Sequence, residues 1–333
     1  MKLLELNCPP PCGGRFFMNE RATPAAIKKA AAILRRGGVV AFPTETVYGL
    51  GADGLDPLAC ASVFEIKGRP RFDPLILHEC SPARARRLFS KVPAAARRLM
   101  DRFWPGPLTL VLPKAAAVPD IVTAGLKTVA VRVPANPVAL ALIKAAGRPV
   151  AAPSANRFGR LSPTTAAHVR KQLGDAPDMI LDGGKTAIGV ESTIITFLGG
   201  RPVLLRPGGL PLEEIEKLTG PAAAAAKPGK LPQAPGCLKK HYAPAAKLRI
   251  IERGAKVKGG PRTAYLAFSK RPGGEFAATA VLSRTGDLRE AAAELFGALH
   301  RLETSGAKVI YAERVPPHGL GRAIMDRLRR AAA

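Results

Sequence analysis

The sequence predicts an α/β fold in which a mixed β-sheet flanked by helices precedes a smaller, open α/β domain. Short apolar strands alternate with helical segments, and Pro or Gly marks most of their boundaries. Some neighbouring strands are joined by turns too short for a helical crossover, so antiparallel pairs are expected beside parallel ones. A stretch rich in Ala, Pro and Gly over 222–244 has no apolar period, which indicates a linker between two domains.

The first regular element is a helix that begins after Thr23 and stops at Gly37. Thr23 is a suitable N-cap, Pro24 fits the first turn, and basic residues fall late in the segment. A buried strand over 39–42 follows. The elements expected next are, in chain order, helix 57–67, strand 74–78, helices 82–89 and 93–103, strands 108–113 and 129–134, helix 138–146, strand 149–153, a helix from about 164, strands 178–184, 192–200 and 202–208, and a helix from about 212.

Four regions are expected along the chain. They are an irregular extension over 1–20, a catalytic domain over 21–215, a linker that could act as a lid over 216–245, and a small α/β domain over 246–333. The last region is expected to contain strands 247–252, 263–268, 279–283 and 308–313 and helices 288–304 and 321–330.

Charge and cysteine content narrow the function classes. The chain of 333 residues carries 51 Lys and Arg against 25 Asp and Glu, a net charge of +26 that would attract a polyanion such as RNA. A GC-biased genome raises Arg, Ala, Pro and Gly together and is the alternative explanation. Five cysteines form no CxxC pair, and the N-terminus lacks a secretory signal, so we expect a cytoplasmic protein. Cys8 and Cys12 could share a metal ion or belong to an irregular tail.

Two segments resemble nucleotide-binding motifs, but each lacks a feature that its motif requires. Gly49, Gly51 and Gly54 satisfy GxGxxG, and Asp73 follows 19 residues later, yet the glycines do not come at the end of the preceding strand. We therefore interpret them as a glycine-rich turn, with a nicotinamide-dependent enzyme as the competing hypothesis. The residues Gly184-Lys185-Thr186 resemble the end of a phosphate loop but lack its first glycine, because position 179 is Met.

Hydroxyl groups and cations gather just beyond the predicted strands. This pattern favours a ligand site, because open α/β sheets bind ligands at that edge and because Arg and Lys suit phosphate and carboxylate groups. A solvated rim is the simpler explanation of any single loop, and the six loops taken together favour the ligand site. His78 alone is more simply explained as a structural histidine, with a role in orienting a substrate as the alternative. The segments concerned are 43–46, 67–70, Arg132, 152–164, 189–193 and 206–209.

These residues in this order resemble the YrdC-like threonylcarbamoyl-AMP synthases in their long form with an extra C-terminal domain. The resemblance spans about 25–210 and implies a YrdC-like twisted mixed sheet with a smaller, Rossmann-like open α/β domain. The matching segments are GGVVAFPTETVYGLGADGLD, KGRP, PLILH, FWPGPLTLVLP, TVAVRVPANP, AAPSANRFGRLSPT, DGG, GVESTII, VLLRPG and, in the linker, PGCLKKHYAP.

The resemblance implies a nucleotidyltransferase that uses ATP with Mg²⁺ to activate L-threonine and bicarbonate or CO₂, releasing pyrophosphate. The product, L-threonylcarbamoyladenylate, would feed a downstream threonylcarbamoyl transferase complex that modifies the tRNA adenosine beside the anticodon. Weak direct binding of tRNA is expected from the charge, and an RNA-binding module is the alternative main role.

The resemblance also implies roles for individual residues. Lys67 and Arg69 are expected to act catalytically by offsetting negative charge on the transferred phosphorus. Position 73 is Asp where the family usually has Asn, and its carboxylate would repel ATP unless it bound Mg²⁺ or paired with Arg69 or Arg71. Threonine would contact Thr46, His78, Arg132, Ala152 and Ser192. ATP would contact Lys67, Arg69, Asp73, Thr128, Ser154, Asn156, Ser162, Arg206 and Tyr242.

Overall fold

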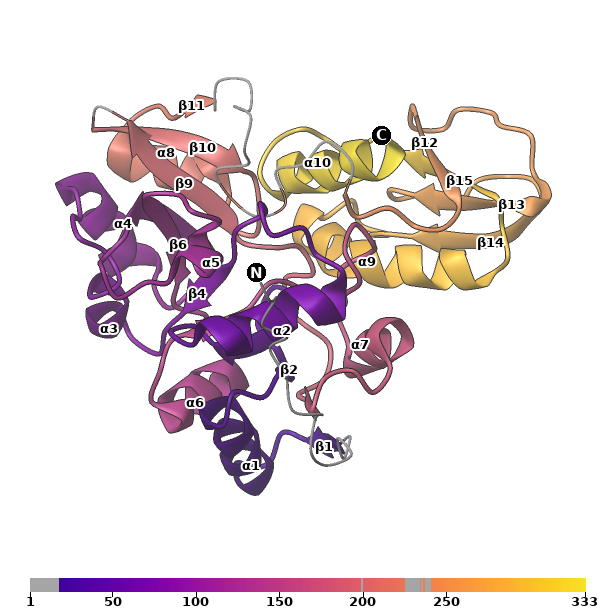
Figure 1. Ribbon diagram of the computed structural model, residues 1–333. Helices are drawn as coiled ribbons and strands as arrows, with labels where there is room; N and C mark the ends of the chain where they lie inside the picture. Colours follow the sequence, from indigo (N-terminus) through magenta and orange to yellow (C-terminus); the bar gives the residue numbers. More distant parts are fainter. Residues whose placement is uncertain (1–17, 199, 225–233, 235, 237–240) are drawn as a thin grey trace, which may run out of the picture.

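The computed structural model describes residues 18–198, 200–224, 234, 236 and 241–333. Two separate β-sheets organise these residues (Figure 1): an eleven-stranded sheet and a four-stranded sheet, each with its own helices. The predicted metal pair Cys8 and Cys12 lies outside the described residues. Within the described part, no helix is long and apolar enough to cross a bilayer.

The first sheet is mixed, as the short turns predicted. Strand β2 (Val40–Pro43) is antiparallel to β3 (Tyr48–Asp53) and parallel to β8 (Met179–Asp182). Its other strands are β1 (Met18–Arg21), β4 (Ile76–His78), β5 (Leu108–Pro113), β6 (Thr128–Arg132), β7 (Val150–Ala151), β9 (Thr193–Leu198), β10 (Arg201–Arg206) and β11 (Ala223–Ala224), in the order β1-β8-β2-β3-β7-β4-β6-β5-β9-β10-β11.

The helices of this region begin where the sequence places capping residues. Thr23, Asp56 and Asn136 cap helices whose next residue is Pro, and each accepts hydrogen bonds from backbone N–H groups of the first turn. The helices are α1 (Pro24–Arg35), α2 (Pro57–Lys67), α3 (Pro82–Arg86), α4 (Ala94–Phe103), α5 (Asp120–Thr123), α6 (Pro137–Ala146), α7 (Ala166–Leu173) and α8 (Leu212–Thr219).

Two predictions for this region are wrong. The glycine-rich turn over 49–54 is mostly strand β3, in which a Cβ on Gly51 would lie 2.6 Å from the Phe42 ring and 2.7 Å from Val150. Gly51 therefore allows close packing inside the sheet, and the segment is a strand where a dinucleotide fingerprint would need a strand-to-helix loop. The irregular extension over 1–20 is also too long, because Met18–Arg21 forms strand β1 parallel to β8. Helix α5 and strand β11 are further elements that sequence periodicity missed.

The second sheet is entirely parallel, with the order β12-β15-β13-β14. One hydrophobic cluster contains the inner residues of helices α9 (Leu288–Thr304) and α10 (Leu320–Ala332) and alternate residues of every strand, among them Leu248, Leu266 and Ile310. Both helices therefore cover the same face of the sheet. The strands are β12 (Lys247–Ile251), β13 (Gly260–Ala267), β14 (Phe276–Val281) and β15 (Val309–Glu313).

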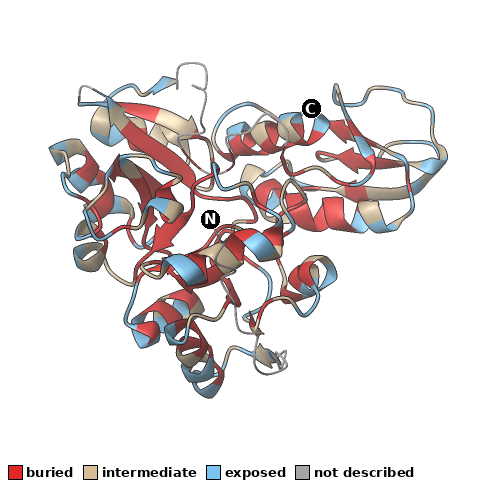
Figure 2. Cartoon of the chain, in the orientation of Figure 1, coloured by how far each residue is buried: buried red, intermediate tan, exposed pale blue. Residues whose placement is uncertain are grey.

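Helix α9 also packs against the first sheet's domain, and buried residues continue across this junction (Figure 2). Gly189 has a φ of +77°, and a Cβ there would lie 2.4 Å from the Ala292 carbonyl oxygen. Only glycine suits both the backbone angle and this close approach. His168 and His300 stack across the junction with ring centroids 3.9 Å apart, and His300 Nε2 donates to the Ser162 carbonyl at 3.2 Å.

Candidate active site

Residues from distant parts of the chain enclose one small polar cavity of about 50 Å³ between the first sheet and the linker. We call it the central cavity. Three arginines from different parts of the chain, Arg69, Arg132 and Arg206, face it. Of the predicted site residues, those that line it are Thr46, Arg69, His78, Arg132, Ala152, Ser154, Ser192, Arg206 and Tyr242.

A tight turn between β2 and β3 places Thr46 in the cavity wall. Thr44 donates from its hydroxyl to the Val47 carbonyl at 2.7 Å, and its Oγ1 lies 2.8 Å from that of Thr46. Arg132, the last residue of β6, donates to Thr46 Oγ1 at 2.9 Å and to the Gly106 carbonyl at 3.1 Å. Its Nη2 lies 2.6 Å from Glu45 Oε1, which the sequence analysis did not single out. The guanidinium is thereby held in a fixed orientation.

His78 ends the neighbouring strand β4 and is buried beside Arg132. Burial, reinforced by the positive charge of Arg132, lowers the pKa of His78 to about 3. Its Nδ1 donates to the Ile76 carbonyl at 3.2 Å. The ring is therefore neutral near pH 7, and it can contact a ligand but cannot supply a charge.

Arg69 and Asp73 form a buried ion pair at 2.9 Å between Nη2 and Oδ2, and neither side chain is more than 3% exposed. Arg69 also donates to the carbonyls of Asp73 and Pro74 at 3.0 and 2.7 Å. Burial raises the pKa of Asp73, while the charges of Arg69, Lys67 and Arg206 act in the opposite direction. The pairing with Arg69, one of the two outcomes expected for this Asp, neutralises its charge.

Lys67, Asn156 and Ser162 lie outside the cavity lining, although they were predicted to contact ATP. Lys67 is 3% exposed and donates from Nζ to the Ser154 carbonyl at 2.6 Å and to the Asn156 carbonyl. Burial, followed by the charge of Arg69, lowers the pKa of Lys67 well below its usual value. Lys67 therefore supports the loop that carries Ser154, while Ser162 donates to Glu191.

Thr128 is not brought to the central cavity. It begins β6, whereas Arg132 ends it, so the two are separated by about 13 Å at 3.3 Å per residue. Thr128 instead lines a separate hollow with Lys91, Lys127 and Thr196. The contact of Thr128 with ATP, which the family resemblance implied, therefore stays a prediction.

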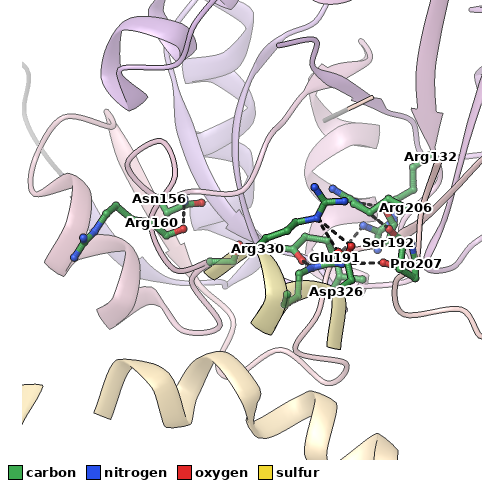
Figure 3. Close-up of polar contacts among 12 residues, drawn as sticks. Arg132, Asn156, Arg160, Glu191, Ser192, Arg206, Pro207, Asp326 and Arg330 are labelled. Atoms are coloured by element: carbon green, nitrogen blue, oxygen red, sulfur yellow. Dashed lines mark hydrogen bonds and ion pairs between the residues drawn. The ribbon is translucent and has the colours of Figure 1, made fainter. Parts of the chain in front are cut away.

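A buried ion pair from the second domain supports the cavity wall, and the sequence analysis missed it. Glu191 lines the cavity and accepts from Arg327 Nε at 2.7 Å, although Arg327 lies on helix α10. Figure 3 shows Glu191 beside Ser192 and Arg206, with Asp326 and Arg330 approaching from that helix. Burial raises the pKa of Glu191, but Arg327, Arg206 and Ser162 outweigh that effect and leave the pKa below its usual value.

Arg206 and Ser192 form the neighbouring part of the wall. Arg206 ends β10 and donates from Nη2 to the Ser192 carbonyl at 2.9 Å and to its hydroxyl at 3.2 Å. The Ser192 hydroxyl also lies 2.7 Å from that of Thr109. These contacts fix a hydroxyl and a guanidinium side by side.

The linker covers the cavity through Gly236, His241 and Tyr242. Tyr242 is 1% exposed and has a φ of +61°, and Arg327 lies 5.0 Å from its ring centroid. The His241 N–H donates to the Arg330 carbonyl at 3.2 Å. The second domain therefore holds the linker over the cavity.

The carboxylates near the cavity leave little for a metal ion to bind. Glu45, Asp73 and Glu191 are each paired with an arginine, and no group of three potential metal ligands occurs in the part of the chain that the structure describes.

Comparisons with known proteins cover nearly the whole chain. A family model described as "Telomere recombination" matches residues 32–208, and one described as "Threonylcarbamoyl-AMP synthase, C-terminal domain" matches 210–333. The chain is 46% identical to a threonylcarbamoyl-AMP synthase of Pyrococcus abyssi (94% of this chain, 96% of the relative). It is 44% identical to one of Bacillus subtilis (92% of each). A crystal structure of P. abyssi Sua5 complexed with L-threonine is similar, with a TM-score of 0.86 at 43% identity over 95% of this chain and 96% of that one.

Proposed function

This chain belongs to the family of threonylcarbamoyl-AMP synthases, and we propose that the central cavity is where it joins L-threonine, bicarbonate or CO₂, and ATP. The product is L-threonylcarbamoyladenylate, and pyrophosphate is released. The observation that carries this proposal is the convergence of Arg69, Arg132 and Arg206 with several hydroxyls in one cavity. Transfer of the threonylcarbamoyl group to tRNA adenosine belongs to a separate downstream transferase complex.

We assign threonine to the side of the cavity formed by Arg132, Thr46 and Ser192. Three protein acceptors orient Arg132: the Gly106 carbonyl, the Thr46 hydroxyl and the Glu45 carboxylate. The threonine carboxylate would bind the guanidinium of Arg132 next to Glu45. The hydroxyls of Thr46 and Ser192 can meet the polar atoms of threonine. Neutral His78 and the small side chain of Ala152 complete this side without adding charge.

The chemistry proceeds in two steps. The threonine amine first attacks the carbon of CO₂, or of bicarbonate with loss of water, and forms a carbamate. A carbamate oxygen then attacks the α-phosphorus of ATP in line, the bond to the bridging oxygen breaks, and pyrophosphate leaves. No enzyme nucleophile is needed, so proximity and electrostatic stabilisation supply the rate enhancement.

We assign the triphosphate to the side formed by Arg69, Ser154 and Arg206. Arg69 and Arg206 present guanidinium groups to the phosphates, where negative charge develops on the leaving pyrophosphate. Lys67 acts in the same region by holding the Ser154 loop from behind through two carbonyls. Substitution Lys67→Ala is therefore expected to slow turnover at least tenfold, and unchanged turnover would contradict this role.

The linker acts as a lid in this proposal. The cavity of about 50 Å³ is far smaller than the roughly 300–1,000 Å³ of ordinary ligand pockets, so we expect Tyr242 and Gly236 to move aside when ATP binds. Closure over the bound substrates would exclude water from the adenylate.

Pyrophosphate release measured with each substrate omitted in turn tests the proposal. We expect release only when threonine, bicarbonate and ATP are all present, together with formation of the adenylate by mass spectrometry. The matched variants Arg206→Gln and Arg201→Gln remove the same charge from opposite ends of β10, and only the first should abolish activity. Release that does not depend on threonine would refute the proposed function.

A further inference from the structure

The second domain contains a hollow of about 810 Å³ that the proposed synthase reaction does not use. Two loops enclose it, 253–257 after β12 and 269–273 after β13, and Tyr265, Phe276 and Glu313 complete the lining. We call it the C-terminal pocket. It is much larger than the central cavity, and it falls within the size range of small-molecule sites, roughly 300–1,000 Å³.

The pocket lies on the face of the four-stranded sheet that the helices leave uncovered. Leu266 and Ala312 join the hydrophobic cluster with α9 and α10, whereas their neighbours Tyr265 and Glu313 line the pocket. Because adjacent residues of a strand point to opposite faces, the pocket is on the side away from both helices. Its loops follow the carboxyl ends of two parallel strands, which is the edge where open α/β sheets bind ligands.

Four exposed cations line this hollow: Arg253, Lys256, Lys270 and Arg271. None of them forms an ion pair with another residue that the structure describes. Glu313 is the single carboxylate in the lining. Like charges gathered around a concave surface raise the local positive potential and concentrate anions there.

Glu313 organises the pocket because it ties both loops to the central strand β15. Its Oε1 accepts from the Gly254 N–H and the Tyr265 hydroxyl, both at 2.9 Å, and its Oε2 accepts from the Phe268 N–H at 2.7 Å. Glu313 is 6% exposed, so these three donors offset its charge inside the protein. The loops are therefore held in place before any ligand arrives, which lowers the entropic cost of binding.

We propose that the C-terminal pocket binds a phosphorylated small molecule of nucleotide size. The four cations suit a phosphate or diphosphate group, with Arg253 and Arg271 able to donate two parallel hydrogen bonds each. Phe276 is partly exposed and packs on the buried Tyr265, with ring centroids 5.2 Å apart, so its ring provides an aromatic surface for a base or another flat group. The cations surround a hollow of defined volume, which favours a small ligand over the extended backbone of an RNA.

Hydrogen–deuterium exchange on the full-length protein tests the proposal with ADP, AMP and inorganic pyrophosphate as probes. We expect ADP to protect the two loops, 253–257 and 269–273. The variant Arg253→Gln/Arg271→Gln should lose this protection and bind ADP in the pocket at least about tenfold more weakly. The control Lys247→Gln/Arg262→Gln removes the same charge near the amino ends of β12 and β13 and should keep the protection.

A second variant, Lys256→Gln/Lys270→Gln, repeats the test with different side chains. The proposal is overturned if none of the three probes protects the loops, or if protection survives in both pocket variants. Protection by a duplex RNA but not by ADP would also overturn it, because that result identifies an RNA-contacting surface. Because the readout is local to these loops, nucleotide bound in the central cavity does not affect the conclusion.

Discussion

Substitution of Arg327 by Met removes the partner of Glu191 and leaves a carboxylate buried between the two domains. Arg327 is fully buried and donates to Glu191, to the Pro207 carbonyl at 2.9 Å and to Asp326 at 2.6 Å. Asp326 retains Arg330 at 3.0 Å, whereas among the described residues Ser162 is the one side-chain donor left to Glu191. Breaking one side of a buried ion pair costs about 3–5 kcal/mol, and we expect a loss of that size in the free energy of unfolding near pH 7.

The loss of stability caused by Arg327→Met should be larger at neutral pH than at acid pH. In the wild type the pKa of Glu191 lies below its usual value, so the pair stabilises the fold above the unfolded pKa of about 4.3 and loses its contribution as the pH falls through the folded pKa. Without Arg327, the pKa of Glu191 should rise, because only Arg206 and Ser162 then oppose the effect of burial. Protonation of Glu191 in the variant then removes the unpaired buried charge as the pH falls. The difference in free energy of unfolding between wild type and variant should therefore shrink toward pH 4.

Urea unfolding at pH 7.5 and pH 4.5 measures both effects. Trp104, the single tryptophan, reports on the first domain, and far-ultraviolet circular dichroism reports on the whole chain. The double variant Glu191→Gln/Arg327→Met removes the buried charge and should regain at least half of the lost stability. A loss below about 1 kcal/mol at pH 7.5, or one that is equal at both pH values, would refute the reasoning.

Three further predictions concern the site and the domain junction. Arg132→Gln should raise the KM for threonine at least tenfold with little change in the KM for ATP in the pyrophosphate assay, and equal increases would contradict the assignment. Gly236→Ala should lower the rate of ATP-dependent pyrophosphate release, because its Cβ would lie 2.4 Å from the Tyr242 hydroxyl. The control Gly220→Ala has a similar φ and open space around it, so it should keep the wild-type rate. Equal losses in the two variants would exclude crowding at Tyr242 as the cause. Burial lowers the pKa values of His168 and His300 to about 3 and about 4. The free energy of unfolding should therefore fall as the pH drops from about 6.5 toward 4, because the unfolded chain binds protons that the folded chain does not. If the stacked pair is responsible, His300→Phe should make the melting temperature depend less on pH over this range.

Much of the fold followed from local sequence patterns. Thr23 and Pro24 predicted the start of the first helix, which the structure confirms, and the structure adds Asp56 and Asn136 as caps of two further helices. The strands were recognisable because short apolar runs bounded by proline are typical of buried strands. Strand β3 was missed because glycine has low strand propensity on its own, and only its neighbours Phe42 and Val150 explain why glycine is required there.

The candidate site was foreseeable in its loops but not in its contacts. Hydroxyls and cations after strands indicated an anionic ligand, and nine of the predicted residues line the central cavity. Whether a residue faces the cavity or supports it from behind depends on distances across the fold, as Lys67 and Ser162 show. Thr128 begins β6 whereas Arg132 ends it, so the contact of Thr128 with ATP, which only the family resemblance implied, stays a prediction.

By itself, the sequence determined the α/β class, the capped helices and the supply of cations and hydroxyls, since these depend on residues close together in the chain. The tertiary structure alone decided that Arg327 pairs with Glu191, that the linker residues Gly236, His241 and Tyr242 line the central cavity, and that Glu313 ties two loops around a second hollow. The physical reason is that a buried charge is stable only beside its partner. Glu191 and Arg327 form an ion pair only when helix α10 packs against the first domain. No local pattern in either segment predicts this contact, because the two residues lie far apart in the chain.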